Sequence, residues 1–304
     1  MSWFFIALFA PALWSATNHI DKYLLGRYFQ HKGTGALIIF SSLIGLFVLP
    51  VILLFQPNVL GILPLHALLI MGSSIISLMG ILAYLYALGK DEASIVVPLF
   101  QTIPVFAYIL GFVFLDETLT VQQIIAALLI VAGAIIISLS RGEKGAQLKG
   151  MVLLFMLIAS FFIALGSLIF KFVAIQADFW TTSFWMYVGN VLMGAFFLVF
   201  IQQYRNQFVS VVQSNRIPAI GLNGLNEVLD VMASLSLRYA TLLAPLALVW
   251  TVNGFQPFFV LLYGVILTLF FPHIGTESLL KKHLIQKLIA ITLMFAGVYL
   301  LNNV

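Results

Sequence analysis

Cysteine is absent from the sequence, and charged residues are scarce. Without cysteine, the chain has no disulfide, no thiolate metal site and no cysteine nucleophile. Only 8% of its 304 residues are Asp, Glu, Lys or Arg, against roughly 25% in soluble domains. No polar stretch is long enough to form a soluble domain. We therefore expect no appended catalytic module and no nucleic-acid partner, although the formal net charge is +4.

Apolar residues are abundant instead, at 62% of the chain, and the mean hydropathy is +1.13. A helix that crosses a bilayer needs about 20 mostly apolar residues, because only intrahelical hydrogen bonds satisfy its backbone there. The sequence predicts an all-α integral membrane protein with ten transmembrane helices. No Lys or Arg precedes the first apolar run, so we expect a retained helix rather than a cleaved signal peptide. The predicted spans cover residues of about 3–23, 35–55, 64–88, 94–114, 119–140, 150–173, 182–202, 217–238, 242–269 and 285–302.

Similar residues recur between the two halves of the chain at nearly constant offsets. The offset is 149 positions at the first helix of each half, 153 around the third and fourth, and 164 in the last. Five helices per copy is an odd number, so the second copy must enter the membrane in the opposite orientation. Inverted repeats of this kind are found in secondary transporters. We therefore predict two repeats, residues 1–145 and 146–304, around a central cavity. The matched pairs include Lys22 with Lys171, Tyr86 with Tyr239, Ala87 with Ala240, Pro104 with Pro257, and Gly133 with Gly297.

The end of the first half carries a specific motif. The turn from Leu115 to Thr120 reads Leu-Asp-Glu-Thr-Leu-Thr, and the helix after it contains Ala126, Ala132 and Gly133. With Pro98 and Pro104 in the preceding helix, this pattern resembles the ten-helix EamA family of the drug/metabolite transporter superfamily. The resemblance covers essentially the whole chain, although residues 271–275 of the second half lack the acidic turn. It implies a solute carrier whose cavity is lined by helices one, three, four, six, eight and nine.

The orientation in the membrane is predicted differently by charge and by resemblance. Twelve of the 14 Lys and Arg residues fall in odd-numbered loops of the predicted arrangement. Positively charged loops stay in the cytoplasm, which places both termini outside. The family resemblance implies that both termini are cytoplasmic. We favour the orientation that the charges predict.

The predicted eighth helix is unusually polar for a membrane span. Asn223, Asn226, Glu227 and Asp230 are spaced at i, i+3, i+4 and i+7, which places them on one helical face. A carboxylate at the bilayer centre costs on the order of 2.5–3.5 kcal/mol, so it should face a wet cavity or a partner group. We expect Glu227 and Asp230 to bind a cationic or zwitterionic solute, or to exchange it for protons. The alternative is a purely structural pairing with another helix. The corresponding residues of the first half are Ser73, Ser74 and Ser77.

Polar and aromatic residues on three further helices are candidates for the cavity lining. Trp14 and Asn18, one turn apart on the first helix, form the preferred pair, and His19 is a candidate proton relay. Trp250 lies away from the interfacial aromatic belts, so it is a candidate aromatic wall or a packing residue. Lys22 and Lys171 are expected to extend to interfacial water. The remaining candidates are Gln101, Asn253 and Gln256, which lie beside Pro98, Pro104, Pro245 and Pro257, prolines that mark bends in these helices.

The motifs of membrane enzymes are missing. The sequence has no phosphate-binding glycine loop, no His-Glu-x-x-His motif and no Gly-x-Ser-x-Gly elbow, so we expect no enzyme activity, no cofactor and no metal. A passive channel is disfavoured because no repeated filter sequence occurs. We predict a secondary active transporter of a small organic solute, such as an amino acid, amine, vitamin-like metabolite or drug, in a bacterial inner (plasma) membrane. A proton is the candidate coupling ion, and the lipid bilayer is the other partner. The alternative is a translocator of a lipid or lipid-linked molecule on the same fold.

Overall fold

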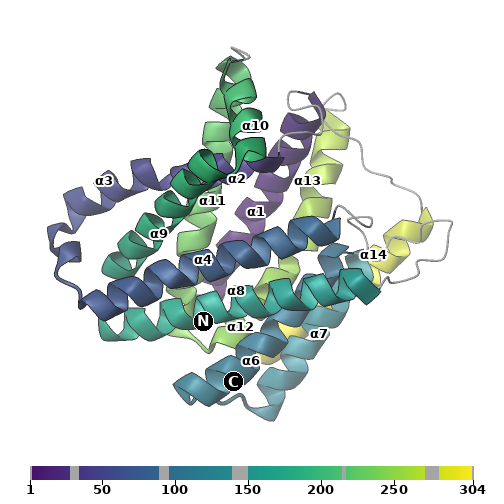
Figure 1. Ribbon diagram of the computed structural model, residues 1–304. Helices are drawn as coiled ribbons and strands as arrows, with labels where there is room; N and C mark the ends of the chain where they lie inside the picture. Colours follow the sequence, from purple (N-terminus) through teal and green to yellow (C-terminus); the bar gives the residue numbers. More distant parts are fainter. Residues whose placement is uncertain are drawn as a thin grey trace.

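The computed structural model describes residues 2–27, 34–88, 96–138, 150–213, 217–270 and 281–302. Every regular element within these ranges is helical (Figure 1). In chain order they are α1 Ser2–Arg27, α2 Thr34–Leu43, α3 Gly45–Phe55, η1 Pro57–Leu60, α4 Pro64–Leu88, η2 Val97–Thr102, α6 Ile103–Leu115, α7 Val121–Ser138, α8 Gly150–Gln176, α9 Phe179–Phe200, α10 Gln202–Gln213, α11 Ile217–Leu243, α12 Leu246–Val252, η3 Asn253–Phe255, α13 Gln256–Phe270 and α14 Lys281–Asn302.

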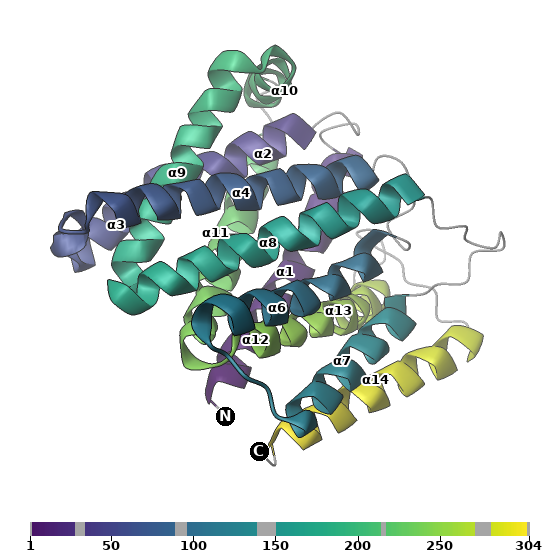
Figure 2. The ribbon, with the colours of Figure 1, turned by 60° about the horizontal axis from the view of Figure 1, so that its bottom comes forward.

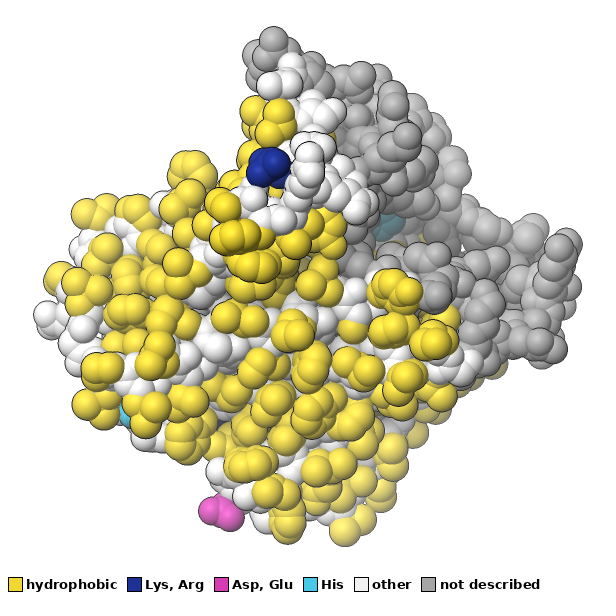
Figure 3. Space-filling model, in the orientation of Figure 1, with side chains coloured by type: hydrophobic (Ala, Val, Ile, Leu, Met, Phe, Trp, Pro, Cys, Tyr) yellow, Lys and Arg dark blue, Asp and Glu magenta, His cyan; other side chains and the backbone are white. Residues whose placement is uncertain are grey.

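The prediction of an all-helical membrane protein is confirmed. Five stretches are long and apolar enough to cross a bilayer, and three shorter helices are also apolar. Large apolar side chains are exposed on these helices, among them Phe47, Leu54 and Phe55 on α3, and they cover the face that Figure 3 shows. Such a surface suits lipid tails rather than water. The five stretches are Gly35–Phe55, Pro64–Tyr84, Gly150–Gln176, Phe179–Phe200 and Leu246–Phe270.

Three predicted spans are interrupted in the structure. The second is divided into α2 and α3 at Ile44, the fourth begins with the 3-10 helix η2, and the ninth is divided by η3. Proline removes a backbone donor and clashes with the preceding turn, so it lies at such breaks. Pro98 lies in η2, Pro245 caps the N-terminus of α12, and Pro257 follows η3. The predicted bends in the fourth and ninth helices are therefore present.

An additional helix, α10, lies between the seventh and eighth predicted spans and was not predicted. It extends from one end of the molecule (Figures 1 and 2) and packs on α2 and α9. Tyr204 and Phe208, four residues apart, contact the cluster around Ile39 and Phe197. This spacing puts both rings on one face of the helix, while Arg205 is exposed. α10 is thus an amphipathic helix at the end of the bundle.

The helices nearest the centre come from both halves of the chain. α1 packs along α11, α4 packs along α8, and α6 contacts α12. Figure 2 shows α7 and α14 side by side at one edge of the bundle, with α2 and α3 at the opposite side. Both ends of the chain lie near each other in Figures 1 and 2.

Paired glycines allow α7 and α14 to pack closely. A Cβ atom added to Gly133 would lie 2.6 Å from the carbonyl oxygen of Ala290 and would also meet Met294. A Cβ atom added to Gly297 would lie 2.7 Å from the carbonyl oxygen of Ala126. Because a later position on α7 meets an earlier position on α14, the two helices run antiparallel. Glycine is required at both positions for this close approach.

We predict that Gly133→Ala lowers the thermal stability of the purified protein. The added methyl group would overpack a tight crossing, which typically costs about 1–3 kcal/mol. Thermal unfolding followed by circular dichroism in detergent measures the effect. Gly72→Ala in α4 is the control, because a Cβ atom there meets nothing within 4 Å. Equal melting temperatures for the two variants would contradict the proposed packing.

Candidate functional site

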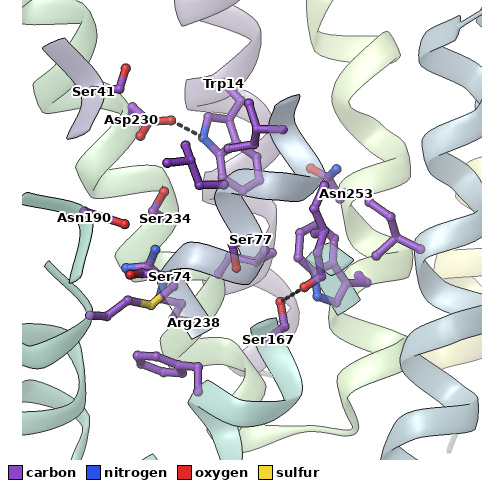
Figure 4. Close-up of a pocket in the computed structure, with 18 of the residues that line it drawn as sticks. Trp14, Ser41, Ser74, Ser77, Ser167, Asn190, Asp230, Ser234, Arg238 and Asn253 are labelled. Atoms are coloured by element: carbon purple, nitrogen blue, oxygen red, sulfur yellow. Dashed lines mark hydrogen bonds between the residues drawn. The ribbon is translucent and has the colours of Figure 1, made fainter. Parts of the chain in front are cut away.

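A cavity of about 350 Å³ lies inside the helix bundle (Figure 4). Side chains from both halves of the chain line it, including Trp14 of α1, Ser77 of α4, and Asp230 and Arg238 of α11. Hydroxyl groups are common in this lining, so the cavity presents many small hydrogen-bonding groups. The lining serines are Ser41, Ser42, Ser74, Ser77, Ser167 and Ser234.

The predicted polar face of α11 points into the protein. Asn223, Asn226 and Glu227 are buried, and Asp230 lines the cavity. The i, i+3, i+4 and i+7 spacing brings the four side chains to one side of a single continuous helix. The stripe is therefore enclosed by other helices rather than turned toward lipid.

The Asp230 carboxylate is held by an aromatic donor from another helix. The indole Nε1 of Trp14 donates a hydrogen bond of 2.8 Å to Asp230 Oδ1 (Figure 4). A hydrogen bond to an ionised group is stronger than one between neutral groups, so it fixes the carboxylate at the cavity wall. Of the preferred pair on the first helix, the structure brings only Trp14 to the cavity, because Asn18 is exposed and does not line it. Trp14 and Asn18 are one turn apart, but only Trp14 faces α11.

Two further polar contacts join the acidic face of α11 to neighbouring helices. Ser41 of α2 donates to Glu227 Oε1 at 2.8 Å. The side-chain amide of Asn226 donates to Asp21 Oδ1 of α1 at 2.7 Å. Glu227 Oε2 is buried and has no hydrogen-bond partner within the described residues. One Glu227 oxygen is therefore unpaired, although Glu227 itself is not among the residues that line the cavity.

His19 lies outside the central cavity. It lines a second, mainly apolar pocket of about 430 Å³ together with Ile20, Leu222 and Tyr263. Its Nε2 atom is 3.1 Å from the carbonyl oxygen of Val260. The structure therefore does not place His19 beside Asp230, as a direct proton relay in the cavity would require.

The broken ninth helix contributes three predicted residues to the cavity wall. Trp250, Asn253 and Gln256 all line it. Trp250 Nε1 and Asn253 Oδ1 are buried without hydrogen-bond partners in the part of the chain that is described, so both are available to a solute. Gln101 is buried but does not line the cavity. Its Oε1 atom instead lies beside Gly254 of η3.

Lys171 does not extend to interfacial water, and this corrects the prediction. It is only 6% exposed. Its ammonium group donates to the carbonyl oxygen of Ala244 at 2.7 Å and forms an ion pair with Glu117. Glu117 also accepts a hydrogen bond of 2.7 Å from the backbone N–H of Leu246. The Glu117–Lys171 pair therefore connects the α6–α7 turn to α8 and to the junction of α11 with α12.

Arg238 is the main cavity residue that sequence reasoning missed, because the predicted helix ended there and the arginine was counted as a loop charge. In the structure α11 continues to Leu243, and Arg238 lines the cavity. His, Asp and Glu side chains in the described ranges form no group of three or more that could hold a metal ion.

The repeat offsets identify many of the other lining residues. Asp230 lies 153 positions after Ser77, and Asn190 lies 149 positions after Ser41. The same offsets lead from a predicted cavity residue in one half to its equivalent in the other half. The pairs that both line the cavity are Trp14 and Ile163, Ser41 and Asn190, Ser77 and Asp230, Ile81 and Ser234, Phe100 and Asn253, and Ile103 and Gln256.

We predict that Lys171→Met destabilises the protein far more than Arg205→Gln, which changes an exposed cation. Removing one member of a buried ion pair leaves the other charge uncompensated and costs about 3–5 kcal/mol. The combination Lys171→Met with Glu117→Gln should recover part of this loss, since it removes both charges. Thermal unfolding of the purified variants measures the coupling. Additive losses in the double variant would argue against the pair.

Comparisons with known proteins agree with a transporter. Residues 1–139 match the model of the EamA-like transporter family. An uncharacterized protein of Methanocaldococcus jannaschii is 44% identical over 68 residues, which are 22% of this chain. The matched part spans 50% of that relative's length.

A solved crystal structure of another protein has the same fold. The TM-score is 0.64, and the match covers 98% of this chain and 96% of the other at 16% sequence identity. At this identity the likeness concerns the fold alone. The family match and the apolar helices together identify a multi-pass membrane protein. Residues 1–139 are thus similar to the EamA-like transporter family, consistent with the drug/metabolite transporter superfamily.

Proposed function

We propose that this protein is a secondary active transporter of a small organic solute that carries a cationic group. The observation that carries the proposal is Asp230, a carboxylate that lines a cavity of about 350 Å³ inside the bundle and is fixed there by Trp14. A charged side chain within a membrane segment is costly, so it marks a solute or ion pathway. A cavity of this volume fits a small metabolite.

The proposed architecture is two inverted repeats, residues 1–145 and 146–304, with ten membrane-crossing segments. Several observations support it. α7 and α14, the last helices of the two halves, run antiparallel and meet at equivalent glycines, Gly133 and Gly297. In the same way Gly45 of α3 packs on α9 near Val191, and Gly194 of α9 packs near Ser42. Two helices that correspond in the repeat and run in opposite directions are expected when the copies are inserted in opposite orientations.

Unequal packing of equivalent helices supports transport by alternating access. α4 packs along α9, whereas the equivalent pairing of α11 with α2 and α3 is slight within the described residues. In a transporter built from inverted repeats, the opposite state exchanges these arrangements between the halves. We propose that α11 closes on α2 and α3 in that state while α4 separates from α9.

Proton coupling is proposed for the carboxylates of α11. Glu227 is buried, accepts one hydrogen bond from Ser41, and keeps Oε2 free. A solute cation at Asp230 in the cavity and a proton on Glu227, one turn earlier on α11, would oppose each other because both are positive, so entry of one favours release of the other. A proton gradient of this kind exists across a bacterial inner (plasma) membrane, which is the proposed location.

We predict that the double variant Glu227→Gln and Asp230→Asn abolishes proton-driven transport. Both replacements keep the size of the side chain and remove the negative charge that a cation requires. Uptake and efflux of radiolabelled amines and amino acids, measured in proteoliposomes with an imposed pH gradient, test this.

Asp116→Asn is the matched control for that experiment. Asp116 is exposed and has a φ of 53°, a left-handed conformation that asparagine also tolerates. The control variant should transport normally. Transport by the folded double variant at the rate of the control would exclude the proposed role of the carboxylates.

A second prediction concerns alternating access. A Cβ atom on Gly189 of α9 would meet Ser74 and would lie 2.9 Å from the Cα atom of Met71 on α4. Gly189→Ala should therefore disfavour the observed packing of α4 on α9 and populate the opposite state. Because the chain has no cysteine, a Ser77→Cys reporter in the cavity can be labelled with an impermeant thiol reagent from either side. If Gly189→Ala leaves the relative labelling of Ser77→Cys from the two sides of the membrane unchanged, the proposed exchange between the two states is contradicted.

The apolar pocket beside His19 favours a second candidate function, translocation of a lipid or lipid-linked molecule. This pocket is formed by residues of α1, α11 and α13, and its apolar lining suits an acyl chain. Phospholipid that remains with the purified protein, detected by native mass spectrometry, together with lipid scrambling in vesicles would favour this function. Counterflow of a water-soluble amine would favour the solute carrier.

A further inference from the structure

Arg238 is held between two aromatic rings at the wall of the cavity. Its guanidinium carbon lies 5.6 Å from the ring centroid of Phe170 on α8 and 5.6 Å from that of Tyr187 on α9. Cation–π contacts of this kind stabilise the charge and orient the planar group. The guanidinium carries five N–H donors, and a cation–π contact does not consume them.

The hydrogen-bonding capacity of Arg238 is only partly satisfied by the protein. Its Nη1 atom is buried without a hydrogen-bond partner among the described residues, and no described carboxylate forms an ion pair with it. Buried polar groups in native proteins nearly always have partners, and those without one need an explanation. In a cavity open to a solute, the fitting partner is an anionic group of that solute, which a guanidinium binds through two parallel hydrogen bonds.

Asp230 and Arg238 occupy separate parts of the same cavity. They are eight residues apart on α11, which corresponds to about 12 Å along the helix axis. Figure 4 shows Ser234 between them, and Asp230 bonded to Trp14 rather than to Arg238. The cavity therefore presents a negatively charged and a positively charged group at different heights along α11, near enough for Arg238 to act electrostatically on Asp230.

We propose that Arg238 binds an anionic group of the transported solute while Asp230 binds its cationic group, so that the solute is a zwitterion whose opposite charges are several bonds apart. This inference rests on the proposed function and deepens it. An α-amino acid has its two charges on neighbouring atoms and contacts only one end. An ω-amino acid of similar length reaches both ends.

Four six-carbon probes separate these cases: 6-aminohexanoate, 2-aminohexanoate, hexylamine and hexanoate. Binding to the purified full-length protein is measured by isothermal titration calorimetry. We expect 6-aminohexanoate to bind about tenfold or more tightly than each of the other three, because one additional charged hydrogen-bonded contact contributes at least that factor. Equal binding of 2-aminohexanoate and 6-aminohexanoate would overturn the inference.

Variants assign the two ends. Arg238→Gln should remove the advantage of 6-aminohexanoate over hexylamine and leave hexylamine binding within about threefold of the wild type, which is a small fraction of the factor expected for a charged contact. Arg238→Lys keeps the charge and should retain part of the advantage, and it provides the test if the glutamine variant does not fold. Arg205→Gln on α10, where the arginine is exposed, is the matched control and should bind all probes as the wild type does.

The outcomes distinguish this inference from the proposed function. If hexylamine binds the wild type but not Asp230→Asn, the cation site stands. If 6-aminohexanoate then binds the wild type no more tightly than hexylamine, the role of Arg238 is overturned. Absence of binding by both 6-aminohexanoate and hexylamine would overturn the cation site and, with it, the inference.

Discussion

Charge inside a bilayer must be enclosed and neutralised by the protein, and this constraint governs the arrangement of the central helices. The chain meets it in two ways. Glu117 and Lys171 neutralise each other, and backbone groups of Ala244 and Leu246 complete their hydrogen bonds. Asp230 and Arg238 are only partly satisfied, by Trp14 and by aromatic rings respectively. The first pair is complete without a ligand and is structural, whereas the second pair is incomplete and faces the cavity.

The two halves share a backbone design but differ in the chemistry of their cavity residues. Ser74 and Ser77 on α4 correspond to Glu227 and Asp230 on α11. If acids occupied both sets of positions, like charges would crowd a small cavity of low dielectric and oppose ionisation. The acids lie on α11 alone, and Arg238 lies on the same helix, so the charges in the cavity are arranged asymmetrically. Two identical repeats would give a symmetric arrangement of charge. The proposed duplication accounts for the scaffold, and the residues that differ within α11 account for the polarity of the site.

Local sequence patterns predicted the helices and the polar face of α11, because apolar runs and i, i+3, i+4 spacing are properties of one segment. Contacts between distant segments were less predictable. Lys171 matches Lys22 in the repeat, but its burial depends on Glu117, 54 positions earlier in the chain. Arg238 was missed because the predicted helix ended at residue 238 and the arginine was counted as a loop charge, while the backbone continues as a helix to Leu243. Asn18 shows that helical periodicity alone does not fix which side of α1 faces its neighbours.

The positions of these groups along α11 connect solute binding to helix movement. Near its first half, α11 is tied to α1 and α2 by the contacts of Asn226 with Asp21 and of Glu227 with Ser41. At its C-terminal end, the chain is tied through Ala244 to Lys171. Asp230 and Arg238 lie between these two attachments. The contacts of Asn226 and Glu227 are single hydrogen bonds between side chains, whereas the Glu117–Lys171 contact is a buried ion pair with further backbone hydrogen bonds. In the proposed transport cycle, movement of α11 would therefore release the contacts to α1 and α2 and pivot about the Glu117–Lys171 end.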